Sequence, residues 1–305
     1  MSLNHFYLLV ILAAIWGSSF TFIKLTINDF GAIPLMSARI GIAALFLIAV
    51  SIVRKRNHIL SISYLIQNKL LWGFAVSGIV GQTIPFALIA FAQHEVSAGN
   101  ASIINATTPF WSAIIAFVWF KKQLTFWQML GMAIGFLGVF YLLNPLTSHP
   151  ESTTNQSTFL YSLIILVATF AYGYAANYLK RYLNDLHSLD VATGSTVAAA
   201  LTSIPLALWF WPNDPISTDA WLSMLMLGML CTGVAYLLFF YLISKVDATS
   251  AVSVTFLVPV FGVLWGWLFL DEKINITTLV AISMIMVGIV LSNQLIKPKT
   301  VKSGH

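Results

Sequence analysis

The chain has 305 residues, of which 59% are hydrophobic and only 8% are charged, with a formal net charge of +5. Soluble globular proteins carry roughly 25% charged residues, so this composition excludes a soluble domain, a nucleic-acid binder and a disordered tail. A single cysteine, Cys231, excludes a disulfide framework and a zinc site built from cysteines. We therefore expect a protein that spans a membrane several times and carries no metal and no cofactor.

Apolar runs long enough to cross a bilayer as a helix, which takes about 20 residues, occur ten times along the chain. We predict spans near residues 5–26, 33–53, 69–91, 97–120, 124–143, 158–179, 188–211, 220–243, 249–270 and 276–295. Several connections are very short, such as residues 121–123 and 271–273, so the helices that they join must run antiparallel. The first run is long and lacks the cleavage site of a removable signal peptide. The sequence thus predicts an all-α membrane protein with ten transmembrane helices and no soluble domain.

The basic residues fall on one side of this topology. Twelve of the fifteen lie there, namely Arg54, Lys55, Arg56, Lys69, Lys121, Lys122, Lys180, Arg181, Lys245, Lys297, Lys299 and Lys302. Most acids lie on the other side, namely Asp29, Glu95, Glu151, Asp214, Asp219, Asp271 and Glu272. Because cytoplasmic loops are rich in Lys and Arg, both termini are predicted to be cytoplasmic, in a multi-pass protein of the plasma (inner) membrane. The net positive charge is then a topology signal and implies no nucleic-acid partner.

Two parts of the chain align without a gap. Placing residues 91–139 over residues 241–289 superimposes the apolar runs, a mid-helix proline and the short turn. Gly17 likewise matches Gly173, at a shift of 156 residues. Each half then has five spans, and because five is odd the second half must enter the membrane from the opposite side. Inverted repeats are typical of secondary transporters with a substrate site between the halves, whereas a channel or a duplicated structural bundle is the alternative.

Several short motifs occur in this doubled arrangement. They are Ala14–Phe20, Pro34–Gly41, Ser97–Ala101, Thr108–Phe110, Leu124–Gly131 and Phe269–Ile274. In these motifs the chain resembles the drug/metabolite transporter superfamily and, within it, the EamA-type ten-helix transporters. The resemblance implies two inverted five-helix repeats around a central cavity, and transport of amino acids, nucleotide-related compounds or other small metabolites, often outward. The chain departs from the family pattern at Lys121–Lys122, where members of the family often have an acid. This difference affects the capping of a helix end and does not bear on transport.

The two repeats set the predicted organisation of the chain. We assign residues 1–146 to the first EamA-like repeat and residues 158–296 to the second. Residues 147–157 form the linker loop, and residues 297–305 form a cytoplasmic tail.

Polar residues at mid-span are candidates for a substrate site, because polar groups inside a bilayer are costly. The candidates that share predicted helix faces are Trp16, Ser19, Gln82, Asn105, Tyr172, Asn177, Tyr236 and Thr255. Amides and hydroxyls can bind the carboxylate and the ammonium of a zwitterion without adding net charge, and aromatic rings supply apolar walls. The alternative is that these groups make interhelical hydrogen bonds, worth roughly 0.6 kcal/mol each.

Three charged residues need separate treatment. Arg39 lies about six residues, or roughly 9 Å, inside the outer end of the second span. It can either snorkel to the headgroups or attract an anionic group of a substrate. Lys24 near the outer end of the first span can also snorkel, and Glu95, beside His94, can pair with either cation. No Asp or Glu lies at mid-span, which argues against exchange of lipophilic cations on a buried carboxylate. Proton coupling through Glu95, His94 or Asp190 is left open but has no support in the sequence.

Prolines and glycines inside the spans predict mechanical features. Pro85, Pro109 and Pro259 interrupt helical hydrogen bonding, and we predict that they act as hinges as the cavity opens to alternate sides. The fifth span carries three glycines at close spacing, residues 131, 135 and 138, which permit close helix packing within the chain or in a homodimer.

The sequence as a whole predicts a secondary transporter that moves small metabolites, such as amino acids or related organic compounds, outward by alternating access. Its partners are then a small-molecule substrate and the lipid bilayer. An uptake permease or a channel-like facilitator is the alternative. A membrane-embedded enzyme is disfavoured, because no catalytic motif of the His-Glu-x-x-His or Gly-x-Ser-x-Gly type is present and no catalytic residue can be assigned.

Overall fold

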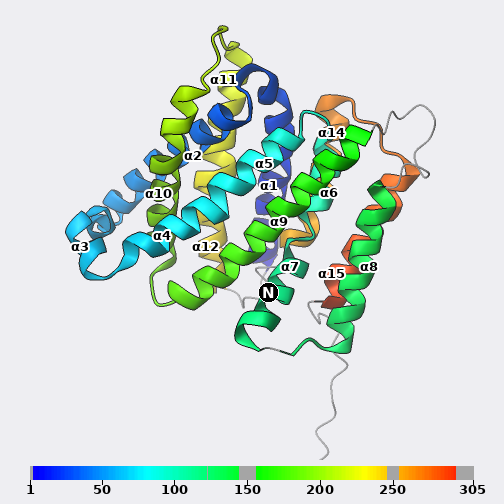
Figure 1. Ribbon diagram of the computed structural model, residues 1–305, viewed down its shortest axis with the longest axis horizontal. Coiled ribbons are helices and arrows are strands. Elements are labelled where there is room, and N and C mark those ends of the chain that lie inside the picture. The colour runs from blue at the N-terminus through cyan, green and yellow to red at the C-terminus, as the bar shows by residue number, and fades with distance from the viewer. Residues whose placement is uncertain (1–2, 122, 144–155, 246–253, 293–305) are drawn as a thin grey trace, which may run out of the picture.

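The structure, a computed structural model, describes residues 3–121, 123–143, 156–245 and 254–292. Within these ranges the chain is helical and has no strand. The helices are α1 (Leu3–Phe30), α2 (Ala32–Val53), η1 (Asn57–Leu60), α3 (Ile62–Gln67), α4 (Leu70–Gly78), η2 (Ile79–Thr83), α5 (Ile84–Ala92), α6 (Ala98–Asn105), α7 (Thr108–Phe120), α8 (Phe126–Leu143), α9 (Gln156–Tyr182), α10 (Ser188–Trp209), α11 (Thr218–Leu225), η3 (Met226–Val234), α12 (Ala235–Lys245), α14 (Val254–Leu270) and α15 (Ile276–Ser292). Figure 1 shows their arrangement as a single bundle.

Eight helical stretches of the described residues are long and apolar enough to cross a membrane. Two further apolar helices, Leu257–Leu270 and Ile276–Ser292, are shorter. The predicted all-α membrane fold is confirmed, while the count of ten spans stays a prediction. The boundaries of the two repeats also stay predictions, because most of the linker 147–157 and the whole tail 297–305 lie outside the described residues.

Three of the predicted spans are built from more than one helical segment. The span near 97–120 breaks after α6, and Pro109 lies in the first turn of α7, where its missing N–H is tolerated. In the other two spans the helix passes through a π-helical segment, η2 in one and η3 in the other. Segments of this kind occur often at functional sites, and hydrophobic periodicity gives no sign of them.

The three predicted hinge prolines have different surroundings. Pro85 lies in the first turn of α5, directly after η2. Pro109 follows a helix break, whereas Pro259 lies inside the continuous helix α14. The two prolines that correspond between the repeats therefore differ in local structure, and their role as hinges stays a prediction.

Two helix crossings use matching residues of the two halves. At the crossing of α1 and α14, a Cβ atom on Gly17 would lie 2.6 Å from the Cβ of Phe261. At the crossing of α9 and α7, a Cβ atom on Gly173 would lie 2.9 Å from the Cβ of Trp111. Gly17 corresponds to Gly173, and Trp111 to Phe261, in the alignment of the halves. Both crossings therefore share one register, as expected for two related halves.

Helices α8 and α15 pack together through glycines on one side of the bundle (Figure 1). A Cβ atom on Gly131 would lie 2.5 Å from the carbonyl oxygen of Gly288, and one on Gly138 would lie 2.9 Å from the Cβ of Met284. The ring of Phe110 fills the space in front of Gly135. The glycines of the fifth span thus serve packing within the chain, and this face is not free to form a homodimer.

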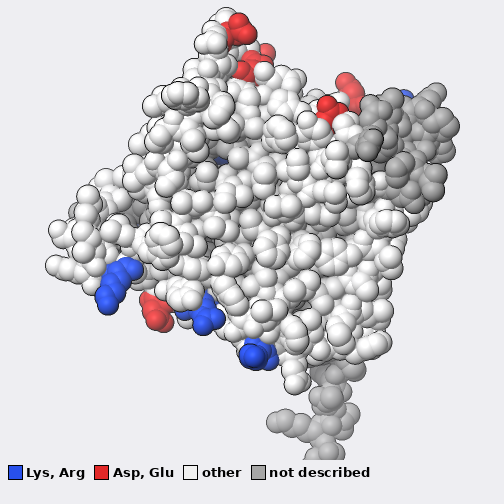
Figure 2. All heavy atoms as spheres, in the orientation of Figure 1, with Lys and Arg blue, Asp and Glu red and all other residues white. Residues whose placement is uncertain are grey.

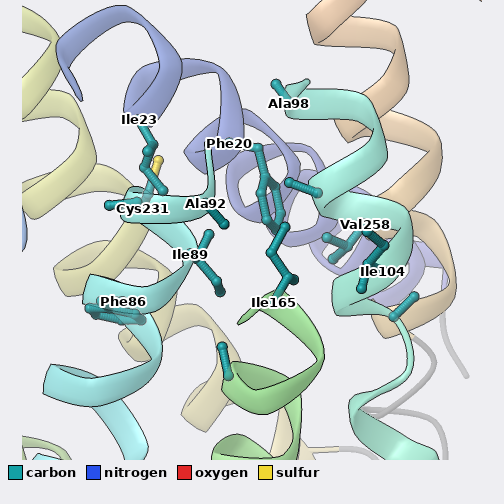
Figure 3. Packing of buried hydrophobic residues seen from close by; sticks show 14 of the residues in the cluster. Phe20, Ile23, Phe86, Ile89, Ala92, Ala98, Ile104, Ile165, Cys231 and Val258 are labelled. Atoms are coloured by element: carbon teal, nitrogen blue, oxygen red, sulfur yellow. The ribbon is translucent and has the colours of Figure 1, made fainter. Parts of the chain in front are cut away.

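The apolar core near the acidic end closes the space between α1, α5 and α9. Figure 3 shows the side chains of Phe20, Ile89 and Ile165 converging from these three helices. Their exposed fractions are 5%, 4% and 0%. The three side chains belong to one buried cluster, and we call them the plug between the middle of the bundle and that end.

Charged side chains gather at the two ends of the bundle. Figure 2 shows acidic groups at the end where α11 begins and mostly Lys and Arg at the opposite end. At the basic end, Arg56 forms a bidentate ion pair with Asp190 of α10, with N–O distances of 2.8 and 2.7 Å. This pair raises the pKa of Arg56 and gives Asp190 a structural partner, so Asp190 is not a free group for proton coupling.

Candidate functional site

A cavity of about 460 Å³ lies between the two halves. It is bounded by side chains of α1, α2, α9 and α10, of the segments around η2 and η3, and of α6 and α7 at their break. The predicted site and hinge residues that line it are Trp16, Ser19, Arg39, Gln82, Asn105, Pro109, Tyr172 and Tyr236. The structure therefore brings most of the mid-span polar candidates around one space.

One predicted substrate-binding residue, Asn177, does not line this cavity. The side-chain amide of Asn177 donates hydrogen bonds of 3.0 Å to the backbone carbonyl and the hydroxyl of Ser112, and one of 2.9 Å to the carbonyl of Gly173. Asn177 thus connects α9 to α7, which is the alternative role of an interhelical hydrogen bond. The side chain of Thr255 lies outside the described part of the structure.

The charged candidates of the outer end form a separate group. Lys24 donates hydrogen bonds to the backbone carbonyls of Gln93, at 2.6 Å, and His94, at 3.2 Å, and so ties α1 to the turn after α5. Partial burial, followed by the nearby Lys24 ammonium, lowers the pKa of His94. Glu95 is exposed and forms no ion pair with any of the described residues. Neither Lys24 nor Glu95 lines the cavity.

A carboxylate of the second half caps a helix of the first half. The two side-chain oxygens of Glu272 accept hydrogen bonds from the backbone N–H groups of Ala98, at 2.6 Å, and Gly99, at 2.9 Å. A Cβ atom on Gly266 would lie 2.5 Å from the same carboxylate, so this glycine leaves room for it. Glu272 thereby fixes the N-terminus of α6 to the turn after α14, an interaction between the halves that sequence reasoning did not find.

We expect the substitution Glu272→Gln to lower the stability of the protein by about 1–2 kcal/mol, because one charge-assisted hydrogen bond is lost and an amide N–H then faces a backbone N–H. The measurement is thermal unfolding of the purified full-length protein in detergent. The matched control is Asp271→Asn, which changes the neighbouring acid. The backbone φ of Asp271 is 53°, a conformation that asparagine tolerates. Equal unfolding temperatures for the two variants would show that the cap contributes nothing.

Arg39 lies inside the bundle and not at its surface. Its exposed fraction is 6%, and its Nε donates a hydrogen bond of 2.8 Å to the hydroxyl of Thr232 in η3. The guanidinium carbon lies 3.9 Å from the centre of the Phe86 ring, a cation–π contact. The arginine therefore points into the cavity, and the snorkelling alternative does not describe it.

Two hydrogen bonds link corresponding helices of the two halves, although not all of their partners are equivalent residues, because Arg39 corresponds to Ser195 and not to Thr196. Arg39 of α2 bonds to Thr232 of η3, and Gln82 of η2 bonds to Thr196 of α10, with Nε2 donating over 3.1 Å. Gln82 and Thr232 are equivalent positions in the alignment of the halves. The side-chain oxygens of Gln82 and Asn105 are buried and have no hydrogen-bond partner among the described residues. These amide oxygens are therefore acceptors without a donor.

Aromatic rings form much of the remaining wall. The rings of Trp16 and Phe239 lie 5.2 Å apart, and those of Phe86 and Tyr172 lie 6.2 Å apart. Sequence reasoning did not include Phe20 or Phe239 in the site, although both line the cavity. Helical spacing indicates both residues, because Phe20 follows Trp16 by four residues and Phe239 follows Tyr236 by three, which places each ring on the face of a predicted site residue.

The wall of the cavity is unevenly exposed along the bundle. Toward the acidic end the lining residues Ile23 and Ile89 are 2% and 4% exposed. Toward the basic end, where α9 ends and α10 begins, Ala176 is exposed and Leu179 is partly exposed. The plug of the apolar core and the links made by Lys24 and Glu272 stand at the acidic end. The lining is therefore buried toward the acidic end, which we call the closed end, and more exposed toward the basic end, which we call the open end.

An apolar helical bundle with two related halves around an amphipathic cavity defines a membrane transport protein. The sequence pattern of the EamA-like transporter family matches residues 5–144 and again residues 159–294. The chain belongs to the EamA-like transporter family of the drug/metabolite transporter superfamily, and it is a transporter and not an enzyme.

Relatives from bacteria and archaea cover nearly the whole chain. An uncharacterized transporter of Archaeoglobus fulgidus is 25% identical over 94% of this chain and 98% of its own. The uncharacterized transporter YoaV of Bacillus subtilis is 23% identical over 91% and 92%. A probable terminal-alkyne amino-acid exporter of Streptantibioticus cattleyicolor is 23% identical over 94% and 92%. One crystal structure superposes with a TM-score of 0.67 over 94% of this chain and 96% of its own, at 15% identity, which shows the fold alone.

Proposed function

We propose that the protein is a secondary transporter that moves amino acids or related small organic compounds out of the cell by alternating access. The observation that carries the proposal is the cavity of about 460 Å³ between the two halves, with polar groups of both halves on its wall. Its volume lies within the roughly 300–1,000 Å³ range of small-molecule sites. The similarity to a protein described as a probable amino-acid exporter supports the substrate class.

The outward direction rests on the similarity to a probable amino-acid exporter, and the orientation of the bundle agrees with it. With the basic end in the cytoplasm, both termini are cytoplasmic in a plasma-membrane protein. The open end of the cavity then faces the cytoplasm, where an exporter collects its substrate. An uptake permease has the same architecture and runs in the other direction along its gradient, whereas a channel-like facilitator has no step that closes the cavity.

Counterflow tests the proposal directly. Liposomes that contain the purified protein are preloaded with an unlabelled amino-acid mixture. We expect them to accumulate labelled amino acid transiently, because a carrier exchanges one bound molecule for another. We expect Gln82→Ala and Asn105→Ala to raise the half-saturating concentration about tenfold, since the loss of one hydrogen bond to a charged group costs roughly 1.4 kcal/mol or more. Uptake that never exceeds equilibrium would identify a channel.

The matched control is Gln67→Ala, because this glutamine is exposed in α3 at the basic end and lies away from the cavity. If all three variants gave the same half-saturating concentration, the cavity would not be the substrate site. Direction is read in intact cells, where deletion of an exporter raises the internal concentration of its substrate and deletion of a permease lowers its uptake.

A further inference from the structure

We propose that Arg39 is the anion anchor of the cavity and that the substrate is an organic carboxylate with an apolar or aromatic body. This inference rests on the proposed function, since it names the chemical group by which the carrier recognises its substrate. Recognition by this anchor requires the carboxylate and does not require an ammonium group.

Apart from its cation–π contact with Phe86, the charge of Arg39 has no anionic partner among the described residues. A guanidinium carries five N–H donors, and Arg39 uses its Nε–H on Thr232. The ion pairs of the described residues are those of Asp190 with Arg56 and with His58, and neither involves Arg39. A buried cation without an anion is unfavourable in apolar surroundings. A carboxylate bound in the cavity relieves this cost.

The two halves differ at the position of Arg39. The position equivalent to Arg39 in the second half is Ser195, a neutral residue whose hydroxyl donates to Ser77 over 3.0 Å. The helix crossings at these two positions are alike, because a Cβ atom on Gly228 would lie 3.0 Å from the carbonyl oxygen of Arg39 and one on Gly78 would contact the carbonyl oxygen of Ser195. The fold therefore does not require an arginine at this helix crossing. Of the two equivalent positions, only that of the first half contributes a charge to the cavity.

The guanidinium of Arg39 is held on two sides. The guanidinium carbon lies over the Phe86 ring, 3.9 Å from its centre, and the Thr232 hydroxyl accepts the hydrogen bond of the Nε edge. The outer N–H groups of a guanidinium held in this way form the planar fork that binds a carboxylate with two parallel hydrogen bonds. Arg39 is thus oriented before any ligand arrives, which lowers the entropic cost of binding.

The rest of the wall defines the body of the ligand. Beyond the arginine the cavity is lined by rings and aliphatic groups, among them Trp16, Phe20, Phe239 and Val258. The described wall holds no carboxylate that could pair with an ammonium group. The amide oxygens of Gln82 and Asn105 can accept hydrogen bonds from an ammonium or a hydroxyl group, but they supply no charge. Recognition of the carboxylate therefore outweighs recognition of the amine.

Matched ligands test the inference on the intact protein. The thermal stabilisation of the purified full-length protein is measured with aromatic and branched aliphatic amino acids, with their carboxamides, and with the corresponding acids that lack the amine. We expect each carboxamide to bind at least about 30-fold more weakly than its acid, since a hydrogen bond to a charged group contributes that much. Loss of the amine is expected to cost about tenfold and so less than loss of the carboxylate, because the amide oxygens that accept from the ammonium carry no net charge.

Variants of Arg39 assign this preference to the arginine. Arg39→Gln is expected to bind acids and carboxamides equally, and Arg39→Lys to retain part of the preference for acids. The control is Lys24→Gln, which removes a cation that does not line the cavity and should leave the preference unchanged. Equal binding of acids and carboxamides by the unmodified protein would overturn the inference, whether or not any variant folds.

The two proposals fail in different ways. Counterflow that accepts acids and carboxamides equally would support the proposed transport and contradict the role of Arg39 as an anion anchor. Acid-selective binding without counterflow would support the role of Arg39 as an anion anchor and contradict the proposed mode of transport.

Discussion

The substitution Gly288→Ala is expected to destabilise the bundle by about 3 kcal/mol, at the upper end of the cost of overpacking. A Cβ atom at this position would lie 2.5 Å from the carbonyl oxygen of Gly131, 2.8 Å from the backbone nitrogen of Gly135 and 2.9 Å from its Cα. All three atoms belong to the backbone of α8, so no side chain can rotate away. The two helices must separate, and the packing of Gly138 against α15 is lost with them.

The matched control for this prediction is Gly41→Ala in α2. A Cβ atom on Gly41 would meet no atom within 4 Å, and alanine favours a helix interior by about 1 kcal/mol over glycine. Thermal unfolding in detergent measures both variants. A loss of 3 kcal/mol corresponds to roughly 6–12 °C, on the scale known for chains of somewhat smaller size. If both variants unfolded at the temperature of the unmodified protein, the close contact of α8 and α15 would not contribute to stability.

The sequence was sufficient to predict the fold class and the relation of the two halves. Charge scarcity and apolar runs determine the helices, and the alignment of residues 91–139 with residues 241–289 predicts which crossings resemble one another. The crossings at Gly17 and Gly173 show that this alignment also holds in three dimensions. The segments η2 and η3 were not predictable, because a π-helical segment adds no residue type or spacing that hydropathy can detect.

The site was predictable in composition and less so in detail. Gln82 and Asn177 are both mid-span amides, yet the structure places Gln82 at the cavity and Asn177 between α9 and α7. A membrane helix is apolar on both its lipid face and its packed face, so periodicity does not show which side of a span faces inward. Arg39 was ambiguous for a similar reason, since its long side chain reaches either the headgroups or the interior.

Flux through the protein is expected to be at least tenfold faster when substrate is present on both sides of the membrane than when it is present on one side. The reason is the uncompensated charge of Arg39, which is 6% exposed and pairs with no acid in the described residues. When the empty carrier changes state, water must leave the cavity and the guanidinium loses hydration without gaining an anion. An uncompensated buried ion costs several kcal/mol, and about 1.4 kcal/mol in a barrier already changes a rate tenfold.

Arg39→Gln provides the decisive comparison, because it removes the charge and keeps a polar side chain near Thr232. The empty variant has no buried charge that raises the barrier for its change of state. Substrate on the far side should therefore accelerate its flux little. Carboxamide ligands, which need no anion anchor, serve as its labelled substrates in liposomes. The unmodified protein is measured with acids, and the ratio of two-sided to one-sided flux is compared between the two proteins. A ratio near one for the unmodified protein would mean that the empty cavity closes freely, and that Arg39 is neutralised in that state by some other group.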